Sequence, residues 1–233
     1  MMNENPLFEL NPQEEKFGVT PTTTNCYLGI LRDNDSATNN WMISPDMVAK
    51  LTENHVSVLM QRGVGETWGF HDLNYADEGA ELFDDPQSVI QTANIILKIS
   101  NFTFEELSLI KEGQTLISCV GFNKMTTSDA EIMMKAKANA LALNLITDRE
   151  GHLVLENMQK NILGEKARQI AFAEFLLPIL IVLMFNRIRF AVQTNPAILQ
   201  SIYCYNGILT HREFAEKHHL KWQDILLLCW NWN

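Results

Sequence analysis

Positive charge is scarce in this chain, and that scarcity limits the partners it can have. The sequence holds 18 Lys and Arg residues against 28 Asp and Glu residues, which gives a formal net charge of −10 at pH 7. Nucleic acids and anionic membrane surfaces both attract proteins through clustered cationic side chains. We therefore expect neither a nucleic acid nor a membrane as a partner.

Cysteine is also sparse, and a signal peptide is not indicated. The four cysteines are scattered, and Cys119 lies inside an apolar run, so reduced thiols are predicted in place of a disulfide framework. The acidic N-terminus lacks the pattern of a signal peptide. The apolar run 175–185 is shorter than the roughly 20 residues of a bilayer span, which favours a core helix. A cytoplasmic protein is expected.

Patterns typical of metal and nucleotide sites are missing as well. His211, His218 and His219 do not follow the Cys/His or carboxylate spacing of metal ligands. Gly63 and Gly65 are not followed by the third glycine that a dinucleotide-binding turn needs. We therefore expect no metal and no cofactor.

What the sequence does contain is an alternation of short apolar runs with amphipathic stretches. Strands are predicted at 25–31, 56–60, 95–99, 116–120 and 140–146, with a short strand or a connector at 81–83. Helices are predicted at 45–54, 72–79, 86–93 and 127–137, with another helix between the strands at 95–99 and 116–120. Such alternation predicts an α/β fold with a flavodoxin-like parallel sheet and helices on both of its faces.

Three regions are predicted along the chain. Residues 1–22, interrupted by prolines, are expected to form an extended N-terminal arm whose apolar Leu7, Phe8 and Leu10 are candidates for packing on a neighbour. Residues 23–150 form the α/β domain, and residues 151–233 a helical segment that packs on the same domain. Helical patterns in that segment cover 156–171, 172–192, 195–202, 210–218 and 221–230.

The residues that follow the predicted central strands include no strong acid, base or nucleophile. Parallel sheets place their chemistry beyond the carboxyl ends of the strands, which here carry Ser100, Asn101, Gly121 and Asn123. A serine without an evident base nearby is a weak nucleophile. Catalysis at this edge is not indicated.

Two blocks of motifs nevertheless occur in a recognisable order. The first runs from LGILRDNDSATNNWMISP through Gly63-Val64-Gly65-Glu66 to Ile96-Leu97-Lys98-Ile99, and the second from Leu177-Pro178 through Asn195-Pro196-Ala197-Ile198 to Tyr205-Asn206-Gly207. In both blocks the chain resembles the alanine dehydrogenase and pyridine nucleotide transhydrogenase family. The resemblance implies the family's substrate domain without its NAD-binding Rossmann domain, because the roughly 25 residues between the blocks are too few for one.

The resemblance also implies that the family's catalytic groups are absent. Its substrate-clamping Arg falls on Asn40, a strand-end Lys on Ser100 and an acid/base His on Gly121. In the family these groups would hold a carboxylate, polarise a keto oxygen and move a proton. We therefore assign no catalytic residue, and name a candidate ligand cleft formed by Arg32, Asn40, Lys98, Ser100, Asn101 and Asn123.

These observations favour a catalytically degenerate, alanine-dehydrogenase-like binding or interaction module, regulatory in role, that takes a small carboxylate. One alternative is the substrate half of a split NAD(P)-dependent dehydrogenase or transhydrogenase, acting with a separate nucleotide-binding chain. Another is a structural oligomerisation protein held by the arm and the Trp-rich terminus. A homodimer is expected, and under the first alternative a separate protein partner.

Overall fold

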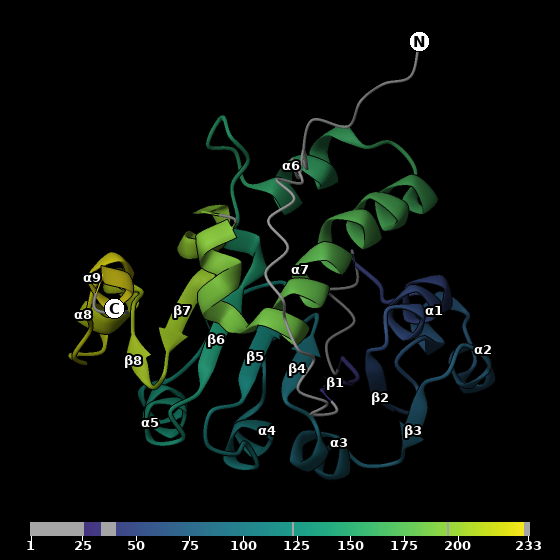
Figure 1. Cartoon of the computed structure of the whole chain (residues 1–233), viewed down its shortest axis with the longest axis horizontal. Helices are drawn as coiled ribbons and strands as arrows, with labels where there is room; N and C mark the ends of the chain where they lie inside the picture. The colour runs from purple at the N-terminus through teal and green to yellow at the C-terminus, as the bar shows by residue number, and fades with distance from the viewer. Residues whose placement is uncertain (1–25, 34–40, 123, 195, 231–233) are drawn as a thin grey trace, which may run out of the picture.

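An eight-stranded sheet organises the chain, with its strands side by side from β3 at one edge to β8 at the other (Figure 1). The computed structural model describes residues 26–33, 41–122, 124–194 and 196–230. The strand order is β3-β2-β1-β4-β5-β6-β7-β8. The strands are β1 (Tyr27–Ile30), β2 (Ser57–Gln61), β3 (Glu81–Phe83), β4 (Ile95–Lys98), β5 (Thr115–Ser118), β6 (Asn139–Ala142), β7 (Ile202–Tyr205) and β8 (Ile208–Leu209).

Strands β1 to β6 are parallel, and β7 and β8 are antiparallel to their neighbours. The run β2-β1-β4-β5-β6 is the flavodoxin-like order. The predicted fold class is therefore confirmed, with β3 added at one edge and the β7–β8 hairpin at the other.

Helices cover both faces of this sheet. They are α1 (Pro45–Glu53), α2 (Asp72–Asp77), α3 (Pro86–Thr92), α4 (Phe104–Ser108), α5 (Thr127–Lys135), α6 (Val154–Asn161), α7 (Glu165–Thr194), α8 (Arg212–Lys217) and α9 (Ile225–Trp230), with 3-10 turns at Glu66–Trp68, Leu143–Leu145 and Pro196–Ser201. In Figure 1, α7 crosses in front of the central strands, and α3, α4 and α5 lie along the lower edge.

Neighbouring residues of one strand pack into different cores, because side chains alternate across a sheet. Leu97 of β4 packs with Val48 of α1 and Phe172 of α7. Ile96, one residue earlier, packs with Leu107 of α4 on the opposite face. All five side chains are at most 2% exposed, and each such burial stabilises the fold by about 1.5–3 kcal/mol.

Helix α1 shows how local sequence sets an element. Ser44 caps it, since its side chain accepts a hydrogen bond from the Met47 N–H at 3.3 Å, and Pro45 takes the first helical position. Met47, Val48 and Leu51 lie on its buried face. The helix predicted at 45–54 is confirmed within one residue.

The run 175–185 lies inside α7, and one side of it packs in the core. Phe175, Leu176, Ile179 and Leu180 are at most 2% exposed and pack in the cluster on the α1 face of the sheet. By length and composition alone, Glu165–Phe185 would also suit a membrane span. The predicted helix boundary at 171–172 is wrong: the break falls at Gly164, whose positive φ of 91° suits glycine.

Two other boundaries were predicted wrongly. The stretch 143–145 forms a 3-10 turn instead of continuing strand β6. A helix was predicted over 195–202, but Ile202 is the first residue of strand β7. Asn206 and Gly207, with φ of 48° and 76°, form the turn between β7 and β8. Pairing of β7 with β6 supplies the hydrogen bonds that a four-residue strand needs. The predicted arm at 1–22 lies outside the described residues.

Candidate functional site

The strand order places a crevice at the carboxyl end of β1. The chain passes from β1 to β2 on one side and later returns to β4 on the other, and such switch points are where open α/β sheets bind ligands. A cavity of about 330 Å³ lies there. It is lined by Ile30, Leu31, Arg32, Asp33, Trp41, Met42, Ile43, Gly63, Val64, Glu66, Thr67, Trp68, Leu97 and Ile99.

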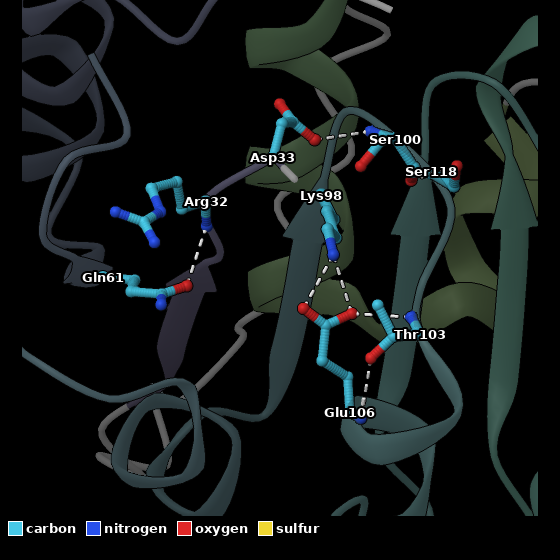
Figure 2. Close-up of polar contacts among 8 residues, drawn as sticks. All are labelled: Arg32, Asp33, Gln61, Lys98, Ser100, Thr103, Glu106 and Ser118. Carbon is cyan, nitrogen blue, oxygen red and sulfur yellow. Dashed lines mark hydrogen bonds and ion pairs between the residues drawn. The ribbon is translucent and has the colours of Figure 1, made fainter. Parts of the chain in front are cut away.

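Arg32 follows β1 directly and brings a cation to this cavity. Its backbone N–H donates to Gln61 Oε1 at 3.0 Å, which ties the end of β1 to the end of β2 (Figure 2). A Cβ at Gly63 would lie 3.2 Å from the Arg32 Cδ and Nη1, and Gly63 has a φ of 81°. Glycine therefore makes room for the guanidinium, which forms no ion pair with another residue that the structure describes.

The loop after β2 forms a second wall of the cavity, and hydrogen bonds fix its position. The Gly63 N–H donates to Asp72 Oδ1 at 2.8 Å. The Tyr75 hydroxyl donates to the Ile43 carbonyl at 2.9 Å, and burial, followed by the nearby charge of Asp72, raises the pKa of Tyr75. A Cβ at Gly65 would lie 2.4 Å from that hydroxyl oxygen, so glycine lets the loop pass over Tyr75.

Helix α7 positions the third wall. The rings of Trp41 and Phe172 stack with centroids 4.9 Å apart. The Met42 N–H donates to Gln169 Oε1 at 3.0 Å. Two contacts to one helix thus fix a segment that is more than 120 residues away from it in sequence.

Lys98 does not line the cavity. Its side chain is completely buried on the α4 face, and Nζ lies 2.7 Å from both carboxylate oxygens of Glu106 (Figure 2). Glu106 Oε2 also accepts from the Thr103 N–H at 2.8 Å, as part of the capping box of α4. The Lys98 ammonium thus links β4 to α4 through its ion pair with Glu106.

Ser100 and Asp33 join the ends of β4 and β1. The Ser100 N–H donates to Asp33 Oδ1 at 2.7 Å, and the Ser118 hydroxyl donates to the Ser100 carbonyl at 3.0 Å (Figure 2). Cys119 is buried on the cavity's face of the sheet, and burial, with a further contribution from the charge of Asp33, raises the pKa of its thiol well above the usual value. A thiol in that state is a poor nucleophile at neutral pH.

Gly121 and Asn144 meet at the end of β5. Gly121 has a φ of 77°, and a Cβ there would lie 2.6 Å from the Asn144 Oδ1. That oxygen and the Asn101 Oδ1 are buried and have no hydrogen-bond partner among the described atoms. Asn144 thus occupies the space where a side chain at 121 would begin. Asn40 and Asn123 of the candidate cleft lie outside the described residues.

Two of the three histidines singled out earlier, His211 and His218, make side-chain hydrogen bonds. His211 caps α8 by accepting from the Phe214 N–H at 3.3 Å, and burial lowers its pKa. His218 Nδ1 lies 2.9 Å from the Thr127 hydroxyl. Elsewhere in the described chain, Asp148, Glu150 and His152 gather on a surface turn.

Sequence reasoning missed several residues that shape the site. Asp33 and Trp41 were not singled out because their partners, Ser100 and Phe172, are distant in sequence. Glu106 could have been found, because Thr103 and Glu106 have the spacing of a capping box. No local sequence motif predicts that Glu106 pairs with Lys98.

Comparison with known proteins gives one consistent result. The family described as "Alanine dehydrogenase/PNT, N-terminal domain" matches residues 29–162. Alanine dehydrogenase of Mycolicibacterium smegmatis is 25% identical over 128 residues, which cover 55% of this chain and 34% of that protein. Alanine dehydrogenase of Halomonas elongata is 28% identical over 127 residues, covering 54% and 34%. The chain thus spans about a third of the length of these curated relatives.

A solved structure agrees on the fold. An L-alanine dehydrogenase superposes with a TM-score of 0.51 at 19% sequence identity, covering 57% of this chain and 36% of that chain.

Proposed function

This chain belongs to the alanine dehydrogenase/PNT N-terminal domain family, and from that premise we propose that it is a non-catalytic binding module for a small monocarboxylate. The ligand would occupy the cavity at the carboxyl ends of β1, β2 and β4. Arg32 would hold its carboxylate.

The position of Arg32 carries the proposal. A guanidinium binds a carboxylate through two parallel N–H donors, and that of Arg32 stands at the cavity beside a glycine without an ion-pair partner among the described residues. A cavity of about 330 Å³ is small for a ligand site. Asp33 and Glu66 also line it, so a second carboxylate on the ligand would meet repulsion.

The residues at the carboxyl ends of β4 and β5 support the proposal that the chain is not catalytic. The family resemblance predicts a Lys at 100 and a His at 121, and this chain has Ser100 and Gly121 there. Lys98 cannot stand in for the missing Lys, because it is paired with Glu106 on the other face of the sheet. Neither serine nor glycine can transfer a proton at neutral pH as a histidine does.

Arg32→Gln is expected to weaken the binding of a small monocarboxylate at least tenfold, since a charge-assisted hydrogen bond contributes about 1.5–3 kcal/mol. Calorimetric titration with L-alanine, lactate and pyruvate measures the change. Arg62→Gln is the matched control, because Arg62 pairs with Asp72 and Asp84 and does not line the cavity. Equal affinities of the Arg32→Gln protein and the unchanged protein would contradict the proposal.

The purified chain is expected to form no reduced nicotinamide cofactor from L-alanine and NAD. The measurement is the absorbance of the reduced cofactor over time, with an active alanine dehydrogenase as the positive control. Turnover that copurifies with the chain through a second column would refute the non-catalytic assignment.

A second candidate is the substrate half of a split enzyme. The family match favours it, because in the relatives the matching residues are about a third of a longer chain. This candidate requires a nucleotide-binding protein that copurifies with the chain and restores turnover when it is added.

A further inference from the structure

Helix α8 is capped by a side chain that titrates near neutral pH. His211 precedes the helix, and its Nδ1 accepts a hydrogen bond from the Phe214 N–H at 3.3 Å. A backbone N–H can only donate, so this Nδ1 carries a lone pair and no proton. Serine, threonine and asparagine, the usual caps, accept through oxygens that do not titrate in this range. The cap of α8 therefore exists only while His211 is neutral.

The ring of His211 is also part of the contact between α8 and the sheet. It stacks on Tyr203 of β7, with centroids 4.4 Å apart and ring planes 11° from parallel. Phe214, whose N–H is capped, packs on the same tyrosine at 5.5 Å and is 5% exposed, and Ala215 is completely buried. Figure 1 shows α8 at the β8 end of the sheet. The cap thus holds the first turn of the helix where its apolar residues are buried.

We infer that His211 is a pH-sensitive cap: its neutral ring holds α8 on the β7–β8 hairpin, and protonation of the ring releases the helix. Protonation removes the acceptor and sets a second donor opposite the Phe214 N–H. It also places a positive charge at a helix N-terminus, where the helix dipole disfavours cations. The inference is independent of the proposed carboxylate site, which lies at the ends of β1, β2 and β4.

The groups around His211 set the direction of the pH dependence. Burial lowers the pKa of His211 from its ordinary value of 6.5, and the charge of Glu213 opposes that shift. Tyr203 stays neutral, because burial, followed by the charge of Glu213, raises its pKa. Arg212 is paired with Glu216 at 2.7 Å. Because the folded chain binds this proton less tightly than the unfolded chain, the cap stabilises α8 above about pH 6.5, and its contribution is lost as the pH falls below that value.

His218, at the other end of α8, is the competing titratable group. Its Nδ1 lies 2.9 Å from the Thr127 hydroxyl of α5, and its ring stacks on Phe214 at 4.3 Å. A hydroxyl can both donate and accept, so this contact survives protonation of the ring. Lys217 is the basic residue of the last turn. The contact that protonation breaks is therefore the one made by His211.

Hydrogen exchange of the full chain, followed by mass spectrometry on peptides that contain residues 212–217, tests the inference. In the unchanged chain, the protection of these amides is expected to fall about fivefold between roughly pH 7.5 and pH 5.5, after correction for the intrinsic pH dependence of exchange. In the His211→Asn and His211→Ser variants, the protection should be the same at both pH values, because the new side-chain oxygen caps the helix at either pH. Two capping variants keep the test valid if one of them fails to fold.

Four outcomes would overturn the inference. The first is protection of α8 that does not change with pH in the unchanged chain. The second is an equal fall in both His211 variants. The third is a fall that His218→Asn abolishes, which would assign the titration to His218. The fourth is an equal loss of protection in β4, which would mean that acid loosens the whole sheet and not α8.

Discussion

Glu106→Gln is expected to lower the free energy of unfolding by about 3 kcal/mol, because it removes one partner of a buried ion pair. The substitution leaves the Lys98 ammonium buried, at 1% exposure, without the carboxylate that contacts it at 2.7 Å. An uncompensated charge in an apolar interior costs several kcal/mol. Urea denaturation followed by circular dichroism measures the loss.

The double variant Lys98→Met, Glu106→Gln separates charge burial from capping. Glutamine can still accept from the Thr103 N–H, so the capping box survives in both variants. Removing the cation as well should recover most of the lost stability, because replacing a buried ion pair with groups of similar volume is often neutral. If the free energy of unfolding of the Glu106→Gln protein lay within about 1 kcal/mol of that of the unchanged chain, the ion pair would not be buried.

Phe172→Ala is expected to cost about 3–5 kcal/mol and also to weaken carboxylate binding. The Phe172 side chain is 0% exposed, so truncation leaves a cavity between α7 and the sheet. The same ring supports Trp41 at 4.9 Å, and Trp41 forms one wall of the cavity that contains Arg32. Denaturant midpoints and tryptophan fluorescence report the two effects.

Glu174→Ala on the same helix is the control for this prediction. Glu174 is exposed, and substitution at such positions usually changes stability by less than about 0.5 kcal/mol. If Phe172→Ala weakened the fold but left the carboxylate affinity unchanged, Trp41 would not depend on α7 for its position.

The sequence located most of the sheet. Four of the central parallel strands, β1, β2, β4 and β6, contain short apolar runs, and helix starts such as Ser44-Pro45 carry their caps within a few residues. These elements therefore depend on local chemistry. The β7–β8 hairpin was missed, because its strands of four and two residues are stabilised by pairing with β6. The family match covers residues 29–162, so the resemblance stated for the second motif block stays a prediction.

By itself, the sequence determined the fold class, the family and the lack of a strong acid, base or nucleophile at residues 100 and 121. Only the tertiary structure decided which side chains meet. It paired Lys98 with Glu106 on the α4 face and joined Asp33 to Ser100 across 67 residues. It also placed Arg32 beside Gly63 with no ion-pair partner among the residues that the structure describes. The physical reason is that periodicity and capping act over a few residues, whereas strand order brings distant chain segments to one edge of the sheet.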